Sequence, residues 1–193
     1  MKLVDTHTHI YGEKYDDDFS EVISRAEKEL EFIISIGYDL ESSKKGVELA
    51  KKYDFVYSVV GIHPVDIKKY NDEVEQELTK MATDEPKVVA IGEIGLDYHY
   101  LDNPKEVQKM WFETQIEAAV DVNKPIIVHS REACADTIQC MKNKRADKAG
   151  GVIHCYSYTK EAAKEFLDMG FFIGVGGVVT FKNARKLVET VEE

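Results

Sequence analysis

Seven short apolar runs, each followed by an amphipathic stretch, succeed one another along this chain. The runs are rich in Val, Ile and Phe. Several lack the polar alternation of a half-exposed strand, which is typical of parallel strands buried on both faces. They cover residues 2–7, 32–36, 55–61, 88–92, 125–129, 151–154 and 171–175. A repeated strand–helix unit predicts an α/β fold with a parallel sheet, either a closed barrel or an open doubly wound sheet.

The stretches between these runs have helical periodicity. One expected helix carries Phe19, Val22, Ile23, Ala26 and Leu30 on a single face, and another carries Val74, Leu78, Met81 and Ala82. Asn103 before Pro104 predicts the start of a third helix, and Thr159 and Asn183 predict two more starts. No linker or low-complexity segment interrupts residues 1–193, so we expect a single domain.

The composition limits the classes of function and location. Hydrophobic residues make up 44% of the chain, enough for a substantial core. The formal net charge of −11 argues against broad, unassisted binding of nucleic-acid phosphates, although bound metal ions can supply local positive charge. The three cysteines form no CxxC pair, which favours a reducing compartment, and no apolar run is long enough to cross a bilayer. We therefore expect a cytoplasmic protein without a membrane partner, and the oligomeric state stays open.

Histidines gather at one end of the predicted strands. Five of the six fall at or just beyond the C-terminal end of a run, and Glu93 directly follows the run at 88–92. These five are His7, His9, His63, His129 and His154. Barrel active sites lie at the carboxyl ends of the strands, whereas an open sheet gathers its site at one switch point. Ligand-type residues from five strands converge only if the sheet closes, so we expect a TIM (β/α) barrel with seven of its eight βα units in this chain.

His7 and His9 form an H-x-H motif at the end of the first run. Because side chains alternate along a strand, residues i and i+2 point the same way, and the two imidazoles can bind one ion together. The alternative is two ordinary histidines at chance spacing. Their position at the end of a strand favours the metal site.

Glu93 is the candidate catalytic and bridging carboxylate. A carboxylate at the end of a buried apolar strand is costly unless it is paired or metal-bound, and its two oxygens can bridge two cations. The alternatives are a helix N-cap and an ion pair with Arg131.

The remaining candidates each have a structural alternative. His129 and His154 each end an apolar run, so they are metal ligands or neutral histidines hydrogen-bonded inside the barrel mouth. His63 is either a substrate contact or part of a turn with Pro64. Arg131 either contacts a substrate phosphate or pairs with a surface carboxylate.

Six segments, in this order, resemble the TatD family of metal-dependent deoxyribonucleases. They are DTHTH at 5–9, GIHP at 61–64, GEIGLDY at 92–98, PIIVHSR at 125–131, GVIHCYS at 151–157 and GGVVTFKNA at 176–184. The resemblance covers the whole chain. It implies the amidohydrolase superfamily, a TIM barrel and metal-dependent hydrolysis, often as a 3′–5′ exonuclease on single strands.

The resemblance also implies roles for individual residues. His7 and His9 would bind the first metal, Glu93 would bridge both, and His129 and His154 would bind the second. Family members carry a further metal-site Asp on the eighth strand, and this chain ends before any such segment. We therefore expect an incomplete barrel, either because the recorded sequence is shortened or because a neighbouring chain covers the gap.

The function expected from the motifs is hydrolysis of DNA phosphodiester bonds through two-metal activation of water. The cofactors would be two divalent cations (Mg, Mn or Zn, with the identity open), and the partner would be DNA, expected to be single-stranded. The first alternative is a small-molecule amidohydrolase, because the same metals polarise an amide or ester carbonyl. The second is an inactive fragment.

Overall fold

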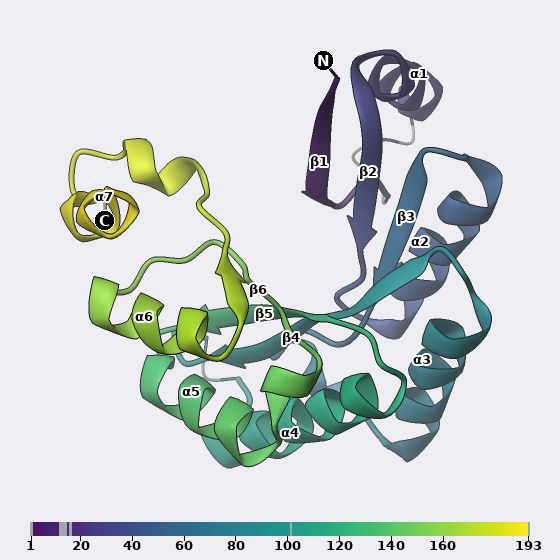
Figure 1. Cartoon of the computed structure of the whole chain (residues 1–193). Coiled ribbons are helices and arrows are strands. Elements are labelled where there is room, and N and C mark those ends of the chain that lie inside the picture. Colours follow the sequence, from purple (N-terminus) through teal and green to yellow (C-terminus); the bar gives the residue numbers. More distant parts are fainter. Residues whose placement is uncertain (1, 12–14, 16, 101, 193) are drawn as a thin grey trace.

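The structure is a computed structural model that describes residues 2–11, 15, 17–100 and 102–192. Its centre is one parallel sheet of seven strands in sequence order. The strands are β1 (Leu3–Thr8), β2 (Leu30–Ile36), β3 (Val56–Val60), β4 (Val88–Asp97), β5 (Ile126–Arg131), β6 (Gly151–Ile153) and β7 (Phe171–Ile173). The sheet curls into a half-barrel (Figure 1). The expected α/β TIM-type fold with seven βα units is confirmed.

A helix follows each strand. The α-helices are α1 (Phe19–Glu29), α2 (Leu40–Lys52), α3 (Asp72–Asp84), α4 (Lys105–Asp121), α5 (Cys134–Asn143), α6 (Lys160–Asp168) and α7 (Arg185–Val191). Short 3₁₀ turns lie at η2 (Ile67–Lys69), η3 (Ala146–Lys148) and η4 (Gly177–Thr180). Helices α3 to α6 cover the outer side of the curled sheet (Figure 1). In the part of the chain that the structure describes, no helix is long and apolar enough to cross a bilayer.

Three helix boundaries differ from the expected ones. Leu30 begins β2 instead of ending α1. Helix α4 begins at Lys105 with Pro104 at the N-cap, since the side chain of Asn103 is used elsewhere. Helix α7 has Ala184, not Asn183, at its N-cap. Thr159 does occupy the N-cap of α6, but its side chain makes no capping hydrogen bond.

The core lies mainly between the sheet and the helices. Its main cluster combines strand residues such as Val60, Ile94 and Val128 with helix residues such as Phe112 and Phe166. A smaller cluster joins one residue from each of four neighbouring strands: Ile36, Val59, Ala90 and Ile127. The four central strands are thus held on both faces, which fixes the positions of their carboxyl ends.

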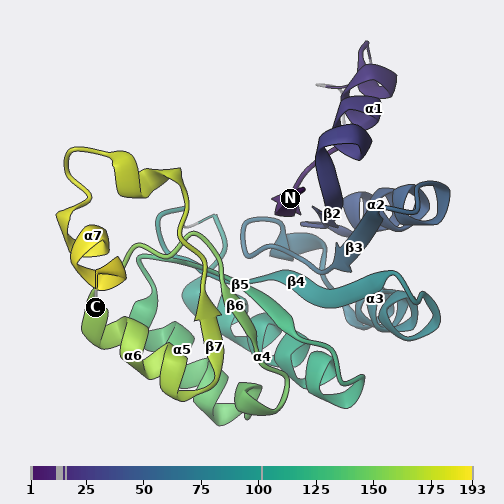
Figure 2. The same cartoon turned by 45° about the horizontal axis from the view of Figure 1, so that its top comes forward.

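The sheet has two edges, β1 and β7. They lie on opposite sides of the opening of the half-barrel in both views (Figures 1 and 2). Both edges carry exposed apolar side chains: Leu3 on β1 is 66% exposed and Phe172 on β7 is 76% exposed. The candidate histidines and Glu93 lie at the end of the sheet where β1, β3, β4, β5 and β6 terminate.

Candidate metal centre

The five candidate histidine and glutamate ligands come from four strand ends. His7 lies in β1, with His9 just beyond it, while Glu93 and His129 lie within β4 and β5. His154 is the first residue after β6. Because the strands run parallel in one curled sheet, their carboxyl ends lie along one rim, and the curl brings the side chains of β1 to those of β4, β5 and β6 (Figure 1).

Glu93 lies at the middle of the cluster. It is 5% exposed, and its two carboxylate oxygens face different histidines. Oε2 lies 3.5 Å from His7 Nε2, and Oε1 lies 3.2 Å from His129 Nδ1. The expected alternatives for Glu93, an N-cap or an ion pair with Arg131, are not what the structure shows. Arg131 instead lies over the Tyr100 ring, with its guanidinium carbon 5.2 Å from the ring centre.

The described residues contain two groups of three in which one possible ligand atom from each residue lies within 4.8 Å of the other two, and Glu93 belongs to both groups. One group is His7, His9 and Glu93, and the other is His63, Glu93 and His129. His154 lies against His7, with the two rings stacked at 3.6 Å between centroids and 11° between planes. His63 lies against His129, at 4.2 Å between ring centroids. The structure thus places His7, His9, His63 and His129 around the shared carboxylate of Glu93, while His154 lies beside them on the His7 ring and belongs to neither group.

The hydrogen bonds of His9 and His129 suit metal binding. His9 Nδ1 lies 3.1 Å from the backbone oxygen of Ile36, and His129 Nε2 lies 3.0 Å from Asp97 Oδ2. In His9 the nitrogen that faces the Ile36 oxygen carries the proton, which leaves the lone pair of Nε2 for a cation. In His129 both nitrogens face carboxylates, and a proton on Nε2, toward Asp97, leaves the lone pair of Nδ1, the nitrogen facing Glu93, for a cation. A donor set of imidazoles and a carboxylate fits Zn or Mn better than Mg, which prefers oxygen ligands.

Burial and the mixture of charges shift the pKa values in this cluster. Burial by itself would raise the pKa of Glu93, but hydrogen bonds and charge from His129 and His7 outweigh it and hold that pKa well below its usual range. Burial, reinforced by the neighbouring His7, lowers the pKa of His154 to about 4. Burial, reinforced by His129, likewise lowers the pKa of His63 to about 4. Burial by itself would lower the pKa of His129, but hydrogen bonds and charge from Glu93 and Asp97 outweigh it and raise that pKa. Ionised Glu93 and neutral His154 are in the forms that bind cations.

Asp97 follows Glu93 closely in the sequence, where it could be expected to shape the site, but the sequence assigned it no specific contact. It ends β4, is 2% exposed and contacts His129. Its other oxygen, Oδ1, accepts hydrogen bonds from the backbone N–H groups of His99 and Tyr100 at 2.9 and 3.0 Å. The buried side chain of Gln108 in α4 bonds to both the N–H and the C=O of Asp97. Asp97 is therefore held rigidly while it orients His129.

A groove opens from the cluster to the surface. It is lined by His9, Tyr38, His63, Val65, Asp66, Glu93, Tyr100 and Asp102. Tyr38 and Tyr100 are 38% and 50% exposed, so each offers a ring to an entering molecule. The groove joins aromatic walls to the buried carboxylate of Glu93.

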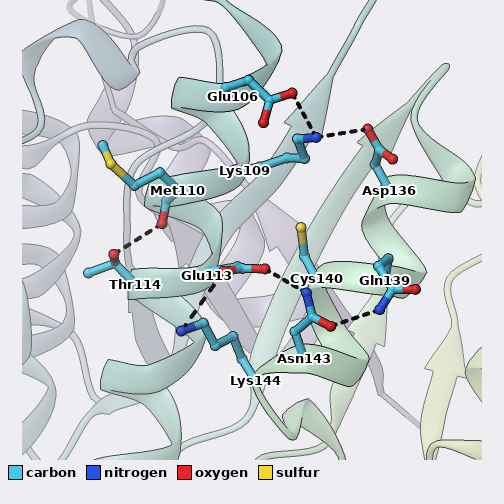
Figure 3. A pocket seen from close by; sticks show the side chains of 10 residues that line it. All are labelled: Glu106, Lys109, Met110, Glu113, Thr114, Asp136, Gln139, Cys140, Asn143 and Lys144. Carbon is cyan, nitrogen blue, oxygen red and sulfur yellow. Dashed lines mark hydrogen bonds and ion pairs between the residues drawn. The ribbon is translucent and has the colours of Figure 1, made fainter.

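A second hollow lies on the helical side of the molecule, between α4 and α5 (Figure 3). Its charged side chains neutralise one another. Lys109 pairs with Glu106 at 2.8 Å and with Asp136 at 3.7 Å, and Lys144 pairs with Glu113 at 3.9 Å. None of the candidate ligands lines this hollow, so it is not part of the metal centre.

Comparison with known proteins gives one consistent result. The chain is 43% identical over 192 residues to the metal-dependent hydrolase YabD of Bacillus subtilis, covering 99% of this chain and 75% of that protein. It is 32% identical to the 3′–5′ ssDNA/RNA exonuclease TatD of Cronobacter turicensis, covering 92% and 67% of the two chains. The crystal structure of the TatD homologue YJJV from Escherichia coli K12 matches with a TM-score of 0.88 and 30% identity, covering 98% of this chain and 73% of that one.

The family model described as TatD related DNase matches residues 4–193. That range contains every strand end that contributes to the cluster. The chain belongs to the TatD family of metal-dependent hydrolases.

Proposed function

We propose that this protein is a metal-dependent phosphodiesterase that degrades single-stranded DNA from its 3′ end. Two divalent cations would be held by His7, His9, Glu93, His129 and His154, with Glu93 shared between them. His63 and Arg131 would contact the substrate.

The observation that carries this proposal is the placement of Glu93. Its two oxygens face His7 on one side and His129 on the other, so a single buried carboxylate links two groups of nitrogen ligands. Such a pair of linked ligand groups suits two-metal hydrolysis, in which the cations stabilise negative charge on the attacking and leaving oxygens.

The protein's own side chains would bind and orient the substrate. Tyr38 and Tyr100 line the groove that leads to Glu93, and exposed aromatic rings stack bases without regard to sequence. Arg131 lies over Tyr100, where its cation can meet a phosphate at the same wall of the groove. The relative from Cronobacter turicensis, named as a 3′–5′ ssDNA/RNA exonuclease, supports the choice of a single-stranded substrate.

The test is an end-specific nuclease assay on protein loaded with Zn²⁺, Mn²⁺ or Mg²⁺. Single-stranded DNA labelled at its 5′ end should give a ladder that shortens with time, and a phosphorothioate linkage at the 3′ end should delay it. EDTA should stop the reaction. Glu93→Gln should abolish it, with Glu132→Gln as a matched control, because Glu132 is exposed and pairs with His99 outside the cluster.

Two results would contradict the proposal. Intact DNA together with hydrolysis of an amide or lactone by the same metal-loaded protein would establish a small-molecule amidohydrolase. Intact DNA with no hydrolysis of any phosphodiester, amide or ester would indicate an inactive protein.

A further inference from the structure

His63 has a hydrogen-bonding pattern opposite to that of the proposed ligands. The backbone N–H of Val65 donates to Nδ1 of His63 at 3.2 Å. A neutral imidazole has one nitrogen with a lone pair and one with a proton. Because Nδ1 is the acceptor, the proton of His63 resides on Nε2.

The comparison with His9 and His129 makes the difference clear. Among the residues that the structure describes, no backbone N–H donates to either of those rings. His9 Nδ1 faces Ile36 O, and both nitrogens of His129 face carboxylates, so each ring donates a proton on one side and can offer a lone pair to a cation on the other. In His63 the lone pair is already used by a backbone donor. His63 therefore presents an N–H group and not a ligand atom, although it lies as close to Glu93 and His129 as a ligand would.

The loop that carries His63 is held by two buried amide side chains. Gln115 in α4 accepts from Ile62 N–H at 2.9 Å and donates to Ile62 O at 3.2 Å. Asn103 donates to the backbone oxygens of Pro64 and Val65, both at 2.9 Å. Both amides are almost fully buried. This bracing keeps Val65 N–H aimed at the ring and so preserves the tautomer.

The position of His63 matches the path of a substrate. Its ring lines the groove together with His9, Glu93 and Tyr100. Within the described ranges 2–11, 15, 17–100 and 102–192, no atom is hydrogen-bonded to Nε2. A preorganised donor of this kind stabilises negative charge that develops on a reacting oxygen.

We propose that His63 donates its Nε2–H to a non-bridging oxygen of the substrate's reacting group, and that Val65, Gln115 and Asn103 position it as a donor and prevent it from ligating a cation. The identity of that group as a phosphodiester rests on the proposed function. The assignment of the His63 proton to Nε2 does not depend on the proposed function.

The tautomer can be tested directly in the wild-type protein. Long-range ¹H–¹⁵N correlation spectra of ¹⁵N-histidine-labelled, Zn²⁺-loaded protein should show a protonated Nε2 and an unprotonated Nδ1 for His63. A protonated Nδ1 would overturn the proposal, because Nε2 would then be free to bind the ion.

Two variants test the role. His63→Ala should leave the number of bound Zn²⁺ ions unchanged by elemental analysis, and it should lower kcat/KM for bis(p-nitrophenyl) phosphate by about 10²–10³-fold. His63→Gln places an amide N–H near the position of Nε2 and should recover part of that loss. Loss of one bound ion in His63→Ala, or an unchanged kcat/KM, would overturn the proposal.

A further measurement separates this proposal from the proposed function. Inorganic phosphate should bind the Zn²⁺-loaded His63→Ala variant roughly 10- to 100-fold more weakly than the wild type, by calorimetry, because a hydrogen bond to a charged group is lost. If the wild type cleaves no phosphodiester, the proposed function fails, and the phosphate affinity and the tautomer still decide the role of His63. Equal phosphate affinity in the two proteins would overturn that role.

Discussion

Asp97 and His129 face each other across 3.0 Å, between Oδ2 of the carboxylate and Nε2 of the ring. Glu93 lies on the other side of the same ring, 3.2 Å from Nδ1. The imidazole is thus held between two buried carboxylates, one belonging to the candidate metal centre and one orienting the ring from behind. A carboxylate that accepts a hydrogen bond from the ring nitrogen facing away from the metal fixes the tautomer of a metal-binding histidine.

Replacing Asp97 by Asn should weaken metal binding without removing a ligand. Oδ1 of Asp97 accepts from the backbone N–H groups of His99 and Tyr100, so the oxygen of Asn would keep that place and its amide N–H₂ would face His129. His129 would then have to accept at Nε2 and carry its proton on Nδ1, toward Glu93. We expect the Zn²⁺ affinity to fall about 10- to 100-fold, measured by competition with a chelating dye.

The control for this substitution is Asp84→Asn, at the exposed end of α3. It makes the same chemical change away from the strand ends and should leave the Zn²⁺ affinity unchanged. Equal affinities of Asp97→Asn and the wild type would show that Asp97 does not control the tautomer of His129.

The contact of Asp97 with His129 was not predicted because the expected strand was too short. The strand at 88–92 was expected to end at Gly92, whereas β4 continues to Asp97. Alternation along the longer strand places Glu93, Gly95 and Asp97 on one face, so the relationship could have been found by extending the strand. The two glycines in GEIG obscured it, because glycine is depleted in strands.

The strand ends with His7, Glu93 and His129 could be predicted because local hydrophobic runs determine them and parallel pairing aligns their carboxyl ends. The hydrogen bonds of the buried side chains that hold the His63 loop could not be predicted. Asn103 was expected to cap α4, but it bonds Pro64 and Val65, 39 and 38 residues away along the chain. A partner so distant leaves no signal in local periodicity.

Removing the amide of Gln115 should destabilise the protein strongly. Gln115→Leu leaves the N–H and C=O of Ile62 buried without their partners. Each unsatisfied buried group costs about 1–3 kcal/mol. Urea unfolding should show a lower free energy of unfolding for Gln115→Leu, whereas Gln139→Leu, on the exposed face of α5, should change it by less than about 0.5 kcal/mol. Similar values for the two variants would mean that the Ile62 groups find other partners.

Gly95 should tolerate no side chain. Its φ is +143°, and an added Cβ would lie 1.9 Å from the backbone oxygen of His129 in β5. Gly95→Ala should therefore lower the free energy of unfolding by about 4 kcal/mol or more, or yield insoluble protein, and any folded fraction should have lost metal affinity. Gly177→Ala is the matched control, since nothing lies within 4 Å of its added Cβ. A Gly95→Ala protein as stable as Gly177→Ala would contradict the close approach of β4 and β5.

The three cysteines should differ sharply in reactivity toward Ellman's reagent. Cys155 is exposed, whereas Cys140 is buried beneath the hollow between α4 and α5. Burial, together with the neighbouring Glu113, raises the pKa of the Cys140 thiol to about 12. At pH 8 the thiolate fraction of Cys140 is then on the order of 10⁻⁴, and the thiolate is the reactive form.

Native protein should show one fast-reacting thiol at pH 8, and protein unfolded in urea should show all three. Cys155→Ser should remove the fast phase and Cys140→Ser should retain it. Loss of the fast phase in Cys140→Ser would mean that the thiol beneath the hollow is open to solvent.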